Sequence, residues 1–139
     1  MIQRVQSLWL LLAVVFAFLT FKLPFYSGSR KDIVPPNVKL NSSSEIALLI
    51  LASIVIILCF AALVTFKNRK RQLTITIVNL IFSIVLIVVY FLQIQKFDPG
   101  TGTLSLSSLF TLAIPLFLFL AARGIWRDEK LIKSLDRLR

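Results

Sequence analysis

The sequence predicts an all-α fold, an integral membrane four-helix bundle with its N and C termini in the cytoplasm. The chain of 139 residues is 58% hydrophobic and has a mean hydropathy of +0.88, which is well above that of an ordinary soluble domain. Its apolar residues form four runs, each about as long as a bilayer-spanning helix. Its cations gather mainly in two clusters beside those runs. We therefore expect a single membrane domain over residues 1–139.

The apolar runs define four expected spans. The first run follows Arg4, and Lys22 interrupts its far end. Because no small-residue cleavage pattern follows this run, we expect a retained membrane helix and not a cleaved signal peptide. The four spans are expected at about residues 8–25, 45–66, 73–94 and 104–122.

A basic connection between the second and third spans determines the orientation of every helix across the membrane. Each of its cations would cost roughly 2.5–3.5 kcal/mol at the bilayer centre, so loop 67–72 is expected in the cytoplasm. About eleven of the 16 Lys and Arg then lie on the cytoplasmic side, as the positive-inside rule requires. The cations of this connection, which are candidate contacts for lipid or a partner, are Lys67, Arg69, Lys70 and Arg71.

The segment 26–44 is the expected periplasmic loop. Two consecutive prolines exclude a helix through its middle, and its apolar residues favour a short extended segment over the helix ends. Closing the bundle is the role that we assign to it, and a ligand-binding cap is the alternative. Ser42 and Glu45 fit a capping box, with Ser42 as the N-cap of the second helix.

The third span carries a polar stripe at the spacing of one helix face. Hydrocarbon offers no hydrogen-bond partner to such groups, so we expect this face to turn toward the other helices. It is also a candidate contact surface for a partner. The stripe consists of Thr76, Asn79, Ser83 and Tyr90, with Gln93 beyond them.

The tail at residues 123–139 is predicted to form a short amphipathic helix. If Gly124 permits a bend, this helix lies on the anionic inner leaflet. If the fourth span continues straight, its apolar side is free to dock a partner. Asp128 falls at the edge of that apolar side. The candidate lipid or partner contacts in the tail are Arg123, Arg127, Lys130, Lys133 and Arg137.

Composition also argues against several function classes. The cations lie at the ends of apolar runs and not in a groove with interleaved aromatics, so no nucleic-acid partner is expected. The chain has no histidine and one cysteine, Cys59, inside an apolar run. The six carboxylates all fall outside the expected spans or, for Glu45, at the very end of one, where no proton path can use them. We expect no catalytic activity, no cofactor and no metal.

Three stretches together resemble one known family. They are MIQRVQS at the start, FKNRKRQ between the second and third spans, and AARGIWRDEK running on to SLDRLR at the end. The chain thereby resembles the domain of unknown function 4293 family, small four-span membrane proteins of Bacteroidota. This resemblance implies a bacterial inner membrane and four helices, and it implies no activity.

The function expected from these features is contact without catalysis. We interpret the chain as an accessory or assembly subunit of a larger inner-membrane complex, with a membrane-protein partner or further copies of itself and with anionic inner-leaflet lipids around it. The alternative is a small oligomeric transporter or channel in which Thr76, Asn79 and Ser83 line the path. Flux through liposomes would separate the two hypotheses.

Overall fold

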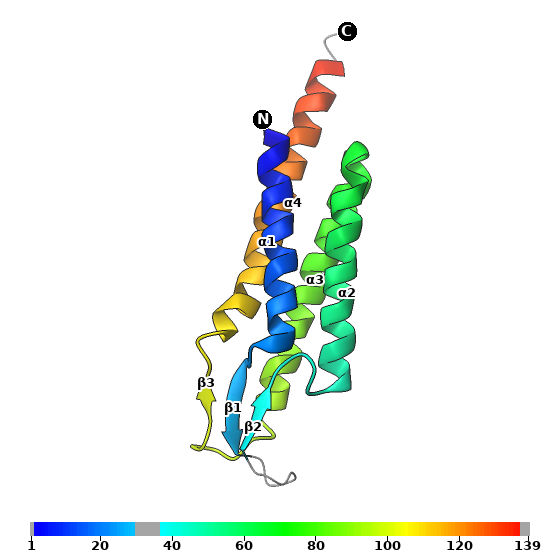
Figure 1. Cartoon of the computed structure of the whole chain (residues 1–139). Helices are drawn as coiled ribbons and strands as arrows, with labels where there is room; N and C mark the ends of the chain where they lie inside the picture. Colours follow the sequence, from blue (N-terminus) through cyan, green and yellow to red (C-terminus); the bar gives the residue numbers. More distant parts are fainter. Residues whose placement is uncertain (1, 30–36, 137–139) are drawn as a thin grey trace.

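The computed structural model describes residues 2–29 and 37–136, and most of these are helical. Four long helices run alternately up and down, so that the two ends of the chain lie at the same end of the bundle (Figure 1). All four are long and apolar enough to cross a membrane, which confirms the prediction of four such helices. The helices are α1 (Ile2–Lys22), α2 (Ile46–Val64), α3 (Arg69–Ile94) and α4 (Ser108–Asp136), with a short 3-10 turn, η1 (Thr65–Lys67), between α2 and α3.

Each helix packs against two neighbours around the bundle: α1 and α3 each contact both α2 and α4. Buried positions recur at alternating spacings of three and four residues along every helix, the repeat of left-handed bundle packing. The buried stripes are Gln6, Leu10, Ala13, Ala17 and Thr20 on α1; Leu48, Ala52, Val55, Cys59 and Ala62 on α2; Gln72, Thr76, Asn79, Ser83, Leu86 and Tyr90 on α3; and Thr111, Ile114, Leu118, Ala121, Ile125 and Asp128 on α4.

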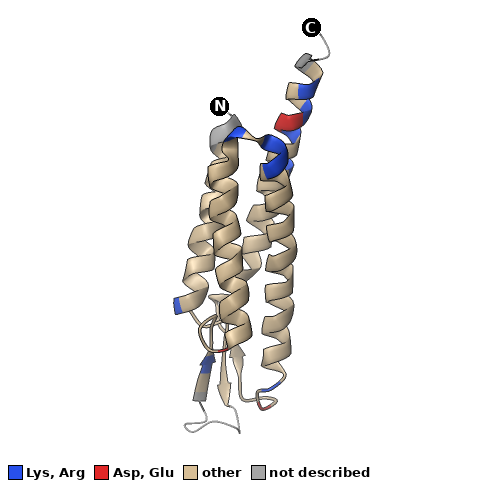
Figure 2. Ribbon diagram, turned by 90° about the vertical axis from the view of Figure 1, so that its right-hand side faces the viewer, with Lys and Arg blue, Asp and Glu red and all other residues tan. Residues whose placement is uncertain are grey.

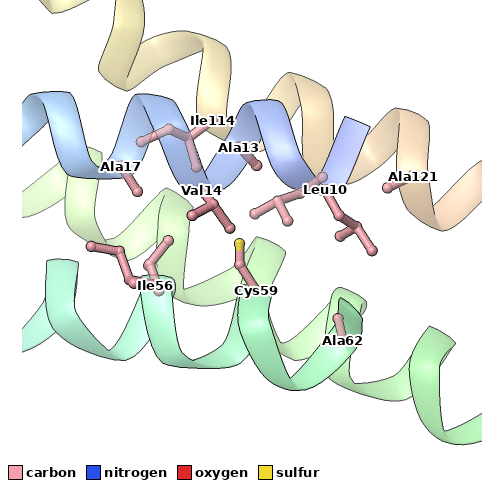
Figure 3. Close-up of a cluster of buried hydrophobic side chains, with 11 residues drawn as sticks. Leu10, Ala13, Val14, Ala17, Ile56, Cys59, Ala62, Ile114 and Ala121 are labelled. Carbon is pink, nitrogen blue, oxygen red and sulfur yellow. The ribbon is translucent and has the colours of Figure 1, made fainter. Parts of the chain in front are cut away.

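The middle of the bundle is an apolar core of small and branched side chains (Figure 3). Ala13 and Ala17 of α1 and Ala121 of α4 are fully or almost fully buried there. Small residues let helix backbones approach closely, which is the usual basis of helix packing in lipid. Large apolar side chains such as Ile57 and Leu116 instead point outward and are exposed. This arrangement suits a bundle whose surroundings are hydrocarbon.

A small antiparallel sheet covers the end of the bundle opposite the termini, here called the sheet end (Figure 1). It contains β1 (Tyr26–Ser29), β2 (Asn37–Leu40) and β3 (Thr103–Leu104), in the order β2-β1-β3. Tyr26 pairs with both Leu40 and Leu104. The all-α prediction is therefore incomplete, because strands of two to four residues carry little periodic signal.

Two predictions about the helix boundaries are wrong. The fourth helix begins at Ser108, four residues after the expected start of its span, and it continues unbroken through Gly124 to Asp136, which is the straight alternative for the tail and not the bend. Ser42 is not the cap of α2, which begins after Glu45 without a side-chain cap hydrogen bond. Ser42 is instead buried in tertiary hydrogen bonds, which outweigh the local capping preference.

Candidate functional site

Lys and Arg gather at the end of the bundle that holds both termini, here called the basic end (Figure 2). The connection between α2 and α3 and the last turns of α4 supply them. Eight of the nine cations predicted as contacts lie in described parts of the chain, whereas Arg137 lies outside the described residues. Arg69 is half-buried, and the exposed ones are Lys67, Lys70, Arg71, Arg123, Arg127, Lys130 and Lys133.

A buried polar network joins all four helices at this end. Arg69 Nη1 donates to Gln6 Oε1 at 3.3 Å and to Gln72 Oε1 at 3.1 Å. Gln6 Nε2 in turn donates to Asp128 Oδ2 at 2.6 Å. Gln72 Nε2 donates to the carbonyl oxygen of Ala62 at 3.1 Å. The basic-end network, defined as Gln6, Arg69, Gln72 and Asp128, therefore ties α1, α3 and α4 together and reaches the last turns of α2.

The network explains how a carboxylate can be buried on the apolar side of α4. Asp128 is only 9% exposed, and burying a carboxylate is costly unless donors reach it. Gln6 supplies a short hydrogen bond of the charge-assisted kind. Gly124, one turn earlier on α4, makes room for Gln6, because a Cβ at that position would lie 2.8 Å from Gln6 Cγ. Glycine is thus required here for close approach and not for a bend.

The polar stripe of α3 lies inside the bundle. Thr76, Asn79, Ser83 and Tyr90 are all buried. Asn79 Nδ2 reaches across to α2, where it lies 3.2 Å from the Val55 carbonyl oxygen and 2.9 Å from Cys59 Sγ. The Thr76 and Ser83 hydroxyls donate instead to carbonyls of their own helix. The stripe is therefore not accessible as a contact surface for a partner, and that part of the hypothesis is wrong.

Tyr90 belongs to a second polar group, the hydroxyl cluster of Thr20, Ser42 and Tyr90 at the sheet end. Ser42 Oγ lies 2.6 Å from Tyr90 Oη and donates to Thr20 Oγ1 at 2.8 Å. The Tyr90 ring stacks on Phe25 with 4.4 Å between the ring centroids. The cluster thus fastens the segment before α2 onto α1 and α3.

The last turns of α4 extend past the ends of the other three helices (Figure 1). The buried stripe of α4 continues at the same spacing to Ile132, two turns after Ile125. Ile125 is 0% exposed, but Ile132 is 48% exposed because the bundle no longer covers it. Leu131 is exposed beside it. The projecting turns therefore present an uncovered apolar stripe flanked by cations.

The sequence alone did not identify Gln6, Gln72 and Asp128 as residues that act together. One signal was available: each residue extends the three-and-four spacing of a buried stripe by one step, at the same end of the bundle. The hydrogen bond between Gln6 and Asp128 could not be predicted from the sequence, because the two residues are 122 positions apart in the chain.

Comparison with known proteins identifies a family and adds no activity. No curated protein and no solved structure shows significant similarity to the chain. The family described as "Domain of unknown function (DUF4293)" matches residues 2–138, which is nearly the whole chain. The chain therefore belongs to the DUF4293 family.

Proposed function

We propose that this chain is a multi-pass protein of the bacterial inner membrane that acts without catalysis, as an accessory or assembly subunit of a larger membrane complex. The basic end faces the cytoplasm, which is supported by the positive-inside rule and the charge distribution of Figure 2. The observation that carries the proposal is the continuation of the buried α4 stripe to an uncovered Ile132.

An uncovered stripe of this kind is typical of a helix that packs against another helix. Helical partners recognise apolar side chains at spacings of three, four and seven residues. Inside the bundle, the same stripe is covered by α1 and α3. Beyond the bundle, we expect a partner's helix to take their place against Ile132 and Leu131.

The cations of the projecting turns define the chemistry of the partner. Arg127 and Lys130 are exposed on these turns, on the side of α4 away from Ile132, and Lys130 Nζ lies 5.8 Å from the centre of the Trp126 ring. Lys133 already pairs with Glu129 of the same helix at 2.8 Å. The positive charge of Arg127 and Lys130 favours a partner with an acidic surface, because complementary charges guide the encounter and select the partner.

The buried polar groups support a role in packing and not in chemistry or transport. Gln6, Asp128 and Asn79 use their hydrogen bonds to join helices. A path lined by Thr76, Asn79 and Ser83 would have to open through the centre of the monomer, where these side chains are buried. The transporter hypothesis therefore receives less support from the geometry than the accessory-subunit hypothesis.

A photocrosslinking amino acid at position 132 tests the proposal in native membranes. We expect it to capture one partner protein, recovered in constant ratio after purification in mild detergent. The matched control places the same amino acid at Leu116, which is exposed on the apolar part of α4 and should capture lipid only. Ile132→Glu should lower partner recovery by about tenfold or more, since a charge replaces the apolar anchor.

Two outcomes would contradict the proposal. One is recovery of a lone monomer in several mild detergents, with no protein captured from position 132. The other is solute flux in liposomes that contain the purified chain and its loss in Asn79→Leu, which would favour the transporter hypothesis.

A further inference from the structure

A groove opens on the outer surface of the bundle between α3 and α4, close to the basic end. Its volume is about 580 Å³, within the roughly 300–1,000 Å³ range of sites for small molecules. Almost all of its lining is apolar, and Arg123 is the charged residue in it. The apolar lining consists of Leu73, Ile77 and Leu80 from α3 and Phe119, Ala122 and Trp126 from α4.

The groove has a polar end and an apolar end. Because α3 and α4 run in opposite directions, Leu73 lies toward the basic end together with Arg123 and Trp126. Lys70 is exposed three residues before Leu73 on the same face of α3 and adds positive charge at the same end. Toward the middle of the bundle, Leu80 and Phe119 continue the lining without charge. An apolar groove with cations at one end matches the shape and charge of an acyl chain joined to a phosphate.

We propose that this groove binds one anionic phospholipid from the leaflet at the basic end. One acyl chain lies along the apolar lining, and the phosphate contacts Arg123, whose guanidinium suits phosphate geometry. A zwitterionic lipid fills the apolar part equally well, but its ammonium group reduces the charge attraction to Arg123. The inference depends on the membrane location of the helices and is independent of the proposed partner at Ile132.

Trp126 offers a direct probe, because it lines the groove and the chain has only one other tryptophan. Trp9→Phe leaves Trp126 as the only indole and keeps an aromatic ring against Phe117, where Trp9 now stacks at 5.6 Å. The chain is placed in vesicles of phosphatidylcholine and phosphatidylglycerol. Bromine atoms on the acyl chains of one lipid or the other, at equal mole fractions, then report which lipid lies beside Trp126.

We expect the brominated phosphatidylglycerol to quench Trp126 more strongly, with a relative affinity of about fivefold from the charge-assisted contact. Arg123→Gln should bring the relative affinity for phosphatidylglycerol over phosphatidylcholine close to one. Arg127→Gln is the matched control, because Arg127 is an exposed arginine of the same helix that does not line the groove. Ala122→Phe, which fills the groove and leaves Arg123 in place, should also remove the preference.

Several results would overturn the inference. Equal quenching by the two lipids would show that the groove does not select charge. An equal loss in Arg127→Gln and Arg123→Gln would show diffuse attraction to the basic end. A preference that survives Ala122→Phe would place the lipid elsewhere. Weak quenching by both lipids that increases on dilution of the protein in the vesicles would show that a second copy covers the groove.

Discussion

The two ends of the bundle are held together by different chemistry. At the basic end, one arginine, one carboxylate and two carboxamides form a network that joins the helices directly. At the sheet end, three neutral hydroxyl groups bond to one another, and most of the contact comes from apolar side chains such as Phe25 and Phe97 beneath the sheet. The basic end depends on specific polar partners, whereas the sheet end depends on packing.

This difference follows from what covers each end. The sheet end has a cap, because β1 and β2 pair with each other and Leu40 fills the space below. The basic end has a short connection between α2 and α3, and α4 runs on past it. A fixed network there holds α4 in one orientation against α1. We expect that orientation to determine how the projecting stripe is presented to a partner.

The largest effect is expected from Gln6→Ala. It removes the short hydrogen bond to Asp128 and one acceptor of Arg69, and it leaves a buried carboxylate without that donor. The free energy of unfolding should fall by about 2–3 kcal/mol, as for hydrogen bonds to charged groups. Reversible unfolding in mixed micelles measures it. The control is Leu8→Ala on the exposed face of α1, and a loss no larger than that of the control would contradict the importance of the network.

A second prediction concerns the sign of the change in unfolding free energy that Gly124→Ala causes. Gly124→Ala should destabilise the parent chain by about 1 kcal/mol, because the new Cβ would press on Gln6 at 2.8 Å. In the Gln6→Ala background the same change should stabilise by about 0.5–1 kcal/mol, the usual helix preference for alanine over glycine. The same unfolding assay measures both. A stability change of the same sign in the parent chain and in the Gln6→Ala background would show that Gly124 does not make room for Gln6.

At the sheet end, Tyr90→Phe should have a smaller effect. It removes the hydroxyl that bonds to Ser42 and keeps the ring stacked on Phe25. Ser42 retains its hydrogen bond to Thr20. We expect a loss of about 1 kcal/mol, the net value of one neutral hydrogen bond. A loss as large as that of Gln6→Ala would remove the distinction between the two ends.

The smallest effect is expected in the middle of the bundle. Asn79 donates to α2, but its Oδ1 has no hydrogen-bond partner among the described residues. Interhelical hydrogen bonds in membranes average about 0.6 kcal/mol. Asn79→Leu should therefore change the unfolding free energy by about 0.6 kcal/mol or less, and a loss of more than about 2 kcal/mol would show that Asn79 holds α2 and α3 together.

Much of the fold was predictable, because hydropathy and periodicity are local properties of the chain. The four long apolar helices and the inward orientation of Thr76, Asn79 and Ser83 follow from residue spacing alone. The role of Ser42 was not predictable, since a local capping pattern competes with bonds to distant residues. The need for glycine at position 124 depends likewise on Gln6, which is remote in the chain.

The central claim is that the basic end of the bundle faces the cytoplasm, and cysteine labelling in intact cells tests it directly. Cys59→Ala gives a chain without cysteine, and single cysteines then replace Lys70 at the basic end or Thr101 near the sheet, both exposed. A maleimide that cannot cross the inner membrane should label Thr101→Cys in intact cells and Lys70→Cys only after the membrane is opened. Labelling of Lys70→Cys in intact cells, with Thr101→Cys protected, would contradict the account.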